Sequence, residues 1–165
     1  MAFSKVLIAN RGEIACRIMG TAHAMGYRTV AVYSEADADA PHVAMADQAV
    51  CIGPAPVGES YLNVTAILQA AARSGADAVH PGYGFLAENA DFAESCADAG
   101  LVFIGPPPQA INLMGNKRLA KLRMTEAEVP CVPGYNGADQ DDGVLAAGVA
   151  ISGVPLLCRA AWGGG

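Results

Sequence analysis

The chain has 165 residues, of which 53% are hydrophobic and 16% are charged, and its net charge is −6 at pH 7. The length fits one domain, or one domain with a piece of another, and the apolar content is sufficient for a hydrophobic core. The acidic charge without a basic cluster argues against binding to nucleic acid or anionic membranes, and no apolar run approaches the roughly 18 residues of a membrane span.

The start of the chain predicts a strand–helix–strand unit. Residues 5–10 form an apolar, β-branched run of strand length, and residues 29–33 form a second one. Between them, apolar residues recur at helical spacing after a turn at residues 11–13, and Gly26 is a candidate helix end. The residues expected on the inner face of this helix are Ile14, Ile18, Ala22 and Met25. Such a unit implies parallel strands joined by a right-handed crossover.

The turn after the first strand resembles a dinucleotide loop only in part. A glycine there, with Glu35 or Asp37 after the second strand, is the arrangement that NAD- and FAD-binding proteins use. Their fingerprint needs three glycines, but residues 10–15 contain only Gly12, and Glu13 would face a pyrophosphate. The pattern therefore predicts a Rossmann-like topology and makes dinucleotide binding the weakest of the functional hypotheses.

Residues 36–104 continue the alternation of helices and strands. Strands are expected at residues 48–52, 78–80 and 101–104, the last of them buried. Ser60 is a candidate N-cap for the helix that ends at Gly75, and another helix is expected at residues 91–99. The alternation indicates an α/β fold, in which a doubly wound parallel sheet is covered by helices on both faces.

The candidate functional loop is the ten-residue stretch from His80 to Asn89, which reads HPGYGFLAEN. Pro81, Gly82 and Gly84 fix an unusual backbone path, and Tyr83 adds a polar side chain. The loop leaves a predicted strand, and an open α/β sheet binds its ligand at the carboxyl ends of its strands. The alternative is a rigid turn that only shapes the fold, and spacing alone favours that alternative.

The character of the chain changes after residue 105. Helices are expected at residues 109–114 and 118–128, followed by an extended segment to residue 135 and a polar, acidic stretch to residue 142. A weak helix at 144–151 and a strand at 155–160 precede the final Gly163-Gly164-Gly165. Three glycines there indicate either a flexible tail or the first half of a glycine loop, and the pattern by itself favours the tail.

The cysteines and the N-terminus bear on the cellular compartment. The five cysteines are scattered without a C-x-x-C pair, so neither a zinc site nor a redox motif is supported, and their apolar neighbours predict buried thiols. The chain enters its first strand without a signal-peptide pattern. We therefore expect a cytoplasmic protein, or one of the mitochondrial matrix if a targeting segment has been removed.

Motifs along nearly the whole chain resemble those of the biotin-dependent carboxylases. The stretch IANRGEIACR at residues 8–17 is similar to the opening of a biotin carboxylase, and the resemblance peaks at residues 76–89. Further similar stretches lie at residues 29–34, 46–54, 59–63, 103–106, 113–117 and 129–135. The chain most resembles the N-terminal part of the α subunit of an acyl-CoA carboxylase, and residues 117–119 and 139–142 lean towards the branched or geranyl-CoA type.

The resemblance implies a fold and a reaction. Residues 1–115 would form the Rossmann-like domain that precedes an ATP-grasp domain, residues 116–135 a linking helix and connector, and residues 136–165 the truncated start of the ATP-grasp lid. In this family ATP activates bicarbonate to carboxyphosphate, and CO2 is delivered to N1 of biotin. The complete enzyme would use ATP, Mg²⁺ and biotin, with none of them tightly bound to this chain.

The resemblance also implies partners. They would be a biotin carboxyl carrier domain, a carboxyltransferase subunit and a second copy of the chain, which would dock through the first helix and Phe85. Neither a nucleic acid nor a membrane is expected as a partner.

Five residues match family positions that bind ATP. Lys117 matches a lysine that contacts nucleotide phosphate, and Arg159 stands in place of a second ATP-binding lysine. Gly163, Gly164 and Gly165 match the first half of the loop that covers the ATP phosphates, and backbone N–H groups cradling phosphate explain the need for glycine there. The resemblance thus reverses the interpretation of these glycines as a tail.

Three residues of the candidate loop match positions on the biotin and bicarbonate side of the family's cleft: Tyr83, Gly84 and Glu88. The family's metal-binding and catalytic residues match no position in this chain, so no catalytic or metal-binding residue is assigned here. The 165-residue chain alone is therefore expected to be inactive.

The chain departs from the family pattern at Gly20, Glu128, Arg159 and Trp162. These departures keep a second hypothesis open, in which the chain is a non-catalytic biotin-carboxylase-like module kept for assembly or regulation. The third hypothesis is a nucleotide-binding Rossmann-like protein that is unrelated to the carboxylases in mechanism.

Overall fold

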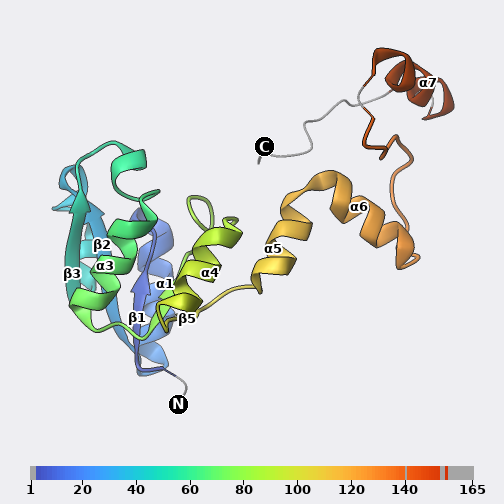
Figure 1. Ribbon diagram of the computed structural model, residues 1–165. Coiled ribbons are helices and arrows are strands. Elements are labelled where there is room, and N and C mark those ends of the chain that lie inside the picture. Colours follow the sequence, from blue (N-terminus) through green and yellow to red (C-terminus); the bar gives the residue numbers. More distant parts are fainter. Residues whose placement is uncertain (1–2, 140, 153–154, 156–165) are drawn as a thin grey trace. The chain divides into compact units, whose positions relative to one another are not determined.

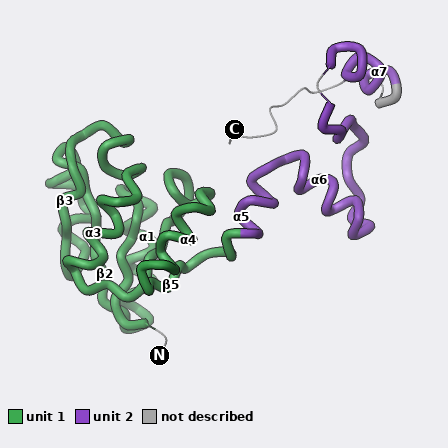
Figure 2. Tube along the Cα trace, viewed as in Figure 1, with its two compact units in different colours: residues 1–108 green, residues 109–165 purple. Residues whose placement is uncertain are grey.

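The computed structural model describes residues 3–139, 141–152 and 155. It divides into two compact units, Met1–Pro108 and Gln109–Gly165, which Figure 2 distinguishes by colour. The strand predicted at residues 155–160, apart from Pro155, lies outside the described residues. The same holds for Arg159, Trp162 and the terminal glycines.

Unit 1 contains a five-stranded sheet in the order β3-β2-β1-β4-β5, with every neighbouring pair parallel (Figure 1). The strands are β1 Lys5–Ile8, β2 Arg28–Ser34, β3 Gln48–Gly53, β4 Ala78–His80 and β5 Val102–Phe103. The helices are α1 Gly12–Ala24, α2 Pro41–Met45, α3 Val64–Ser74 and α4 Ala90–Asp98, with 3-10 turns η1 Glu35–Asp37 and η2 Val57–Glu59. This arrangement confirms the predicted α/β fold with a parallel sheet.

The alternation of side chains along β1 divides the core of unit 1 between the two faces of the sheet. On one face the strand packs against α1, in a cluster that contains Val6, Ile8, Ala15 and Met19. On the other face it packs against α3 and α4, in a cluster that contains Leu7, Ile67 and Phe92. Figure 1 accordingly shows the sheet between α1 and α3. A parallel strand buried on both faces needs a continuous apolar run, which is the pattern seen in residues 5–9.

The predicted inner face of α1 is only partly correct. The residues that α1 buries are Ala15, Met19 and Ala22, whereas Ile14 and Ile18 are half-buried and Met25 is 63% exposed. Two adjacent apolar stripes run along this helix, and the stripe that contains Ala15, Met19 and Ala22 is the buried one. Ile18 packs at the margin of the same core cluster.

The helix ends in unit 1 also differ in detail from the prediction. Asn63, not Ser60, caps α3, because its Oδ1 accepts a 3.0 Å hydrogen bond from the N–H of Ala66. The hydroxyl of Ser60 instead donates to the carbonyl of Pro56 over 2.9 Å. Gly75 ends the helix as predicted, with φ of 63°.

Two predictions of burial are wrong. The strand predicted at residues 101–104 has two residues rather than four, and Val102 is 38% exposed because β5 lies at the edge of the sheet. Among the described cysteines, Cys96 is buried and Cys16 half-buried, but Cys51 and Cys131 are exposed. Apolar sequence neighbours do not ensure burial in an edge strand such as β3 or in an extended segment.

Unit 2 contains most of α5 Pro108–Gly115 and all of α6 Lys117–Glu126 and α7 Asp142–Ser152. Asn116 caps α6 by accepting a 3.0 Å hydrogen bond from the N–H of Leu119. The three-part domain division at residues 115 and 135 stays a prediction. Within the described residues, no helix has both the length and the apolar character needed to cross a membrane.

Candidate functional site

The candidate loop lies at the carboxyl edge of the sheet, at the point where the strand order reverses. It follows β4, which pairs in parallel with β1, and the N–H of Ala9 donates to the carbonyl of His80 over 2.9 Å. From β1 the chain leads through α1 to β2 on one side, whereas β4 and β5 lie on the other side. This confirms the predicted position, and in open α/β sheets such a switch point forms the ligand crevice.

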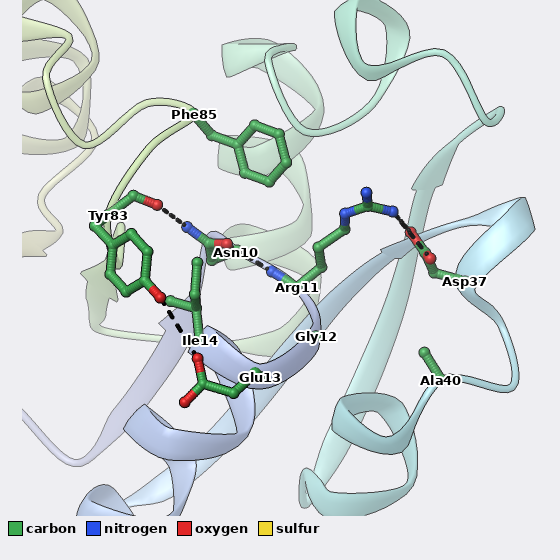
Figure 3. A pocket seen from close by; sticks show the side chains of 9 residues that line it. All are labelled: Asn10, Arg11, Gly12, Glu13, Ile14, Asp37, Ala40, Tyr83 and Phe85. Carbon is green, nitrogen blue, oxygen red and sulfur yellow. Dashed lines mark hydrogen bonds and ion pairs between the residues drawn. The ribbon is translucent and has the colours of Figure 1, made fainter. Parts of the chain in front are cut away.

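A cavity of about 440 Å³ opens beside this loop (Figure 3). Its walls come from the β1–α1 turn, from η1 and the start of α2, and from the loop after β4. The lining residues are Asn10, Arg11, Gly12, Glu13, Ile14, Asp37, Ala40, Tyr83 and Phe85. Its size is within the range of small-molecule sites.

One wall is an ion pair supported by buried hydroxyls. Arg11 Nη1 lies 3.1 Å from Asp37 Oδ2, which also accepts hydrogen bonds from the hydroxyls of Tyr61 at 2.7 Å and Ser34 at 3.0 Å. Burial alone would raise the pKa of Asp37, but these hydrogen bonds outweigh it and the pKa is lowered. Burial and the bond to Asp37 raise the pKa of Tyr61 to about 12. The network holds the Arg11 guanidinium at the rim, 5.6 Å from the centre of the Tyr61 ring.

A buried histidine supports the start of α1 beneath the cavity. His42 Nδ1 accepts a 3.3 Å hydrogen bond from the N–H of Gly12, and its Nε2 lies 3.2 Å from the carbonyl of Val32. Because a carbonyl only accepts, Nε2 carries the proton and the ring is neutral. Burial lowers the pKa of His42, and the charges of Asp37 and Arg11 act in opposite directions on it. A neutral ring suits the positive end of the helix dipole.

The loop presents Tyr83 and Gly84 to solvent. Tyr83 is 65% exposed, and its hydroxyl donates to Glu13 Oε2 over 3.4 Å. Gly84 has φ of 71°, and an added Cβ would meet no atom within 4 Å. Glu88 is also exposed on the same loop, but it does not line the cavity. Two of the three residues predicted for the biotin side thus lie together, and the third follows them along the loop.

The loop is anchored on both sides of this exposed segment. His80 Nδ1 accepts a 3.0 Å hydrogen bond from the N–H of Gly82, so His80 shapes the loop. Phe85 has a left-handed φ of 43° and stacks on Tyr61 with ring centres 5.3 Å apart. A left-handed phenylalanine is strained, and strain of this kind persists only where packing over-determines it.

A second hollow, of about 570 Å³, borders α1 on the far side of Tyr83. Its walls are mostly apolar side chains, including Phe3, Ile14, Ile18, Met25, Tyr27 and Ile104. Ile14 and Tyr83 line both hollows. The half-buried Ile14 and Ile18 of α1 therefore border this hollow, and Ile18 also packs against the core cluster on this face of the sheet.

None of the predicted nucleotide residues belongs to unit 1. Lys117 is the first residue of α6, in unit 2. Arg159, Gly163, Gly164 and Gly165 lie outside the described residues. Among the residues that the structure describes, no group of three or more His, Cys, Asp or Glu is placed to hold a metal ion. The ATP-binding assignments stay predictions.

Sequence reasoning missed the polar residues that support the cavity, namely the buried Asn10, His42 and Tyr61, and it missed the hydrogen bonds of the half-buried Asp37. The only signal for Asn10 was an amide at the end of an apolar strand, and nothing in the sequence pairs Tyr61 with Asp37. Some of their partners are distant along the chain, as in the bond of Asp37 to Tyr61, 24 positions away, and that of Asn10 to Tyr83, 73 positions away.

Comparison with known proteins gives consistent matches. Residues 2–111 match the family model "Biotin carboxylase, N-terminal domain". The chain is 57% identical over 164 residues to the α subunit of the mitochondrial methylcrotonoyl-CoA carboxylase of Oryza sativa subsp. japonica, covering 99% of this chain and 22% of the relative. It is 53% identical to the biotin carboxylase of Allochromatium vinosum, covering 98% of this chain and 36% of that relative.

A solved structure agrees with these matches. The biotin carboxylase domain dimer of the Hydrogenobacter thermophilus 2-oxoglutarate carboxylase, in complex with MgADP, ADP and bicarbonate, gives a TM-score of 0.94 at 47% identity, covering 100% of this chain and 36% of that one. The chain thus spans between about a fifth and about a third of the length of these relatives.

Proposed function

The chain belongs to the family of the biotin carboxylase N-terminal domain, and from this premise we propose that it serves as that domain in an ATP-dependent carboxylase. The reaction is the carboxylation of biotin with bicarbonate, the first half-reaction of an acyl-CoA carboxylase. The observation that carries the proposal is the match over residues 2–111, which includes the whole candidate loop. The named activities of the relatives support the reaction class.

Tyr83, Gly84 and Glu88 form the part of this domain that borders biotin and bicarbonate. Their exposure at the switch point supports this role, because ligands of open α/β sheets bind there. Gly84 leaves open space where a side chain would stand, so a ligand can approach the backbone closely. Bicarbonate in the Hydrogenobacter thermophilus complex is consistent with such a site.

The nucleotide is held by residues of the second unit. Lys117 contacts a phosphate, while Arg159 and the glycines at 163–165 contribute to the phosphate loop. ATP and Mg²⁺ supply the phosphoryl chemistry when they are bound, and MgADP in the same solved structure supports this cofactor set. The chain's own contribution is positive charge and backbone N–H groups, which bind phosphate without taking part in covalent chemistry.

The partners are a biotin carboxyl carrier domain, a carboxyltransferase subunit and a second copy of the chain. The solved relative is a dimer, and the apolar hollow along α1 supports a homodimer through the first helix, while Phe85, the other residue proposed for the interface, lines the first cavity. Relatives named as mitochondrial support the matrix as the compartment. Methylcrotonoyl-CoA and propionyl-CoA carboxylases among the relatives support an acyl-CoA as the final acceptor.

The non-catalytic module remains the second candidate because of one structural observation. Glu128 follows α6 with φ of 59°, a left-handed conformation that favours glycine. A strained end on α6, the helix that begins with Lys117, is easier to tolerate in a domain that no longer binds ATP.

A chimera separates the two candidates. Residues 1–165 replace the matching segment of the Oryza sativa α subunit, and ADP release is measured with free biotin, bicarbonate and Mg²⁺. We expect release that depends on both biotin and bicarbonate and is strongly reduced by Lys117→Ala. The 165-residue chain alone should release no ADP above a no-protein control.

A folded chimera without ADP release would favour the non-catalytic module. The matched variant is then Arg159→Lys, which restores the lysine that the family has at this position. Recovery of ADP release would assign the loss of activity to position 159. If ADP release does not recover, the chain is the non-catalytic module.

A further inference from the structure

The side chain of Asn10 bonds the candidate loop to the end of β1. Its Nδ2 donates to the carbonyls of Pro81 and Tyr83, each over 2.9 Å, and its Oδ1 accepts from the N–H of Arg11 over 2.9 Å. Figure 3 shows the bonds to Tyr83 and Arg11. The residue is 1% exposed. Both amide hydrogens and the amide oxygen are therefore engaged, which fixes the orientation of the group.

The loop backbone touches this amide directly. Gly82 lies between the two carbonyls with φ of 69°, and an added Cβ would stand 2.7 Å from Asn10 Nδ2 and 2.8 Å from Ile14 Cγ2. No side chain fits between the loop and the amide. The glycine in this position is thus required by the contact with Asn10 as well as by its backbone conformation.

The second anchor stands on the other side of the exposed segment. Phe85 stacks on Tyr61 with an interplanar angle of 10°, and Tyr61 is itself buried and bonded to Asp37. Tyr83 and Gly84 therefore lie between two fixed points. The backbone on the N-terminal side is fixed by hydrogen bonds, and the backbone on the C-terminal side by ring stacking.

We propose that Asn10 is the positioning residue that holds Tyr83 and Gly84 in the conformation that borders biotin, a role that rests on the function proposed above. Asparagine suits this position because it donates two hydrogen bonds to carbonyls and accepts one from an N–H. An aspartate of the same shape donates none when ionised and faces two carbonyl oxygens. Alanine leaves both carbonyls without their donor.

The first test uses the 165-residue chain and hydrogen exchange. With Asn10→Asp, the amides of residues 82–87 should exchange at least about tenfold faster, while those of β1 and β2 keep their protection. Asn10→Ala removes the donors without adding charge and should give the same pattern. Asn63→Ala is the matched control, because it removes an asparagine that bonds backbone elsewhere and should leave exchange at residues 82–87 unchanged.

Unchanged exchange at residues 82–87 in both Asn10 variants would overturn the proposal. Global unfolding of both would also overturn it, since Asn10 would then support the fold as a whole rather than the loop.

The second test measures kinetics in the active chimera. Asn10→Asp should raise the KM for free biotin about tenfold while the KM for ATP stays the same, because a loosened loop weakens only the contacts that it carries. Faster loop exchange without a change in the biotin KM would overturn the positioning role and leave only a structural anchor. If the parent chimera is inactive and Arg159→Lys does not restore ADP release, the proposed function fails and the positioning role fails with it, while the exchange data still decide whether Asn10 fixes the loop.

Discussion

At the scale of single residues, the site depends on polar groups that reach across the fold. The glycines and proline of the loop could be recognised in the sequence, because their backbone preferences are local. The groups that fix the loop could not. The amide of Asn10 and the carboxylate of Asp37 are assigned their roles by partners that only the folded sheet brings close.

Gly82 and Gly84 allow a controlled test of this contact. Both have left-handed φ, but a Cβ at Gly82 meets Asn10 and Ile14, whereas one at Gly84 meets nothing within 4 Å. Gly84→Ala should lower the free energy of unfolding by ~1–2 kcal/mol through backbone strain alone. Gly82→Ala should cost this amount and a further ~1–3 kcal/mol of overpacking. Urea denaturation compares them, and equal losses would show that the loop does not lie on Asn10.

His42 should make stability depend on pH. Burial lowers its pKa below the 6.5 of the unfolded chain, so below that pH the unfolded state binds more protons than the folded state. Stability is therefore full above pH 6.5 and falls as the pH drops through the window down to the lowered pKa. His80, whose pKa burial also lowers, contributes with the same sign.

The variant His42→Gln tests this dependence, because glutamine can keep both hydrogen bonds without titrating. The difference in unfolding free energy between about pH 7.5 and about pH 5 should become smaller in the variant, and denaturant titration at both values measures it. An unchanged difference would mean that His42 titrates alike in both states.

At the scale of elements, local signals predicted where helices and strands lie better than how they pack. The β-α alternation, the glycine ends and the short β-branched runs correctly indicated most elements of unit 1. The inner face of α1 was misplaced because two apolar stripes adjoin, and periodicity cannot decide between neighbouring stripes. The cap of α3 was misplaced because serine and asparagine both suit that role.

The end of α6 carries the clearest test at this scale. Glu128 occupies a left-handed position, so Glu128→Gly should relieve strain and stabilise α6 by about 1 kcal/mol. Hydrogen exchange of the α6 amides should slow accordingly. Glu126→Gly is the control, because it places glycine inside the last turn and should destabilise the helix by about 0.5–1 kcal/mol. Faster exchange in both variants would contradict the left-handed conformation of Glu128.

At the scale of the whole molecule, the family and the parallel sheet could be recognised from motifs spread along the chain. The switch point could also be predicted, because the position of a loop at the carboxyl edge follows from strand order and the handedness of crossovers. The cavity could not, since its walls come from three segments that are distant in sequence. The nucleotide half of the site remains a prediction from sequence, as most of its residues lie outside the described part of the chain.

The central claim is that the loop after β4 borders biotin in a carboxylase, and the KM for free biotin in the chimera tests it most directly. Tyr83→Ala and Glu88→Gln should each raise the biotin KM about tenfold and leave the ATP KM unchanged, since a lost polar contact typically costs on the order of 1.5 kcal/mol. Glu94→Gln removes an equal charge from the exposed side of α4 and should change neither constant. Biotin KM values that stay at the parent value in both loop variants, or an equal rise with Glu94→Gln, would contradict the account.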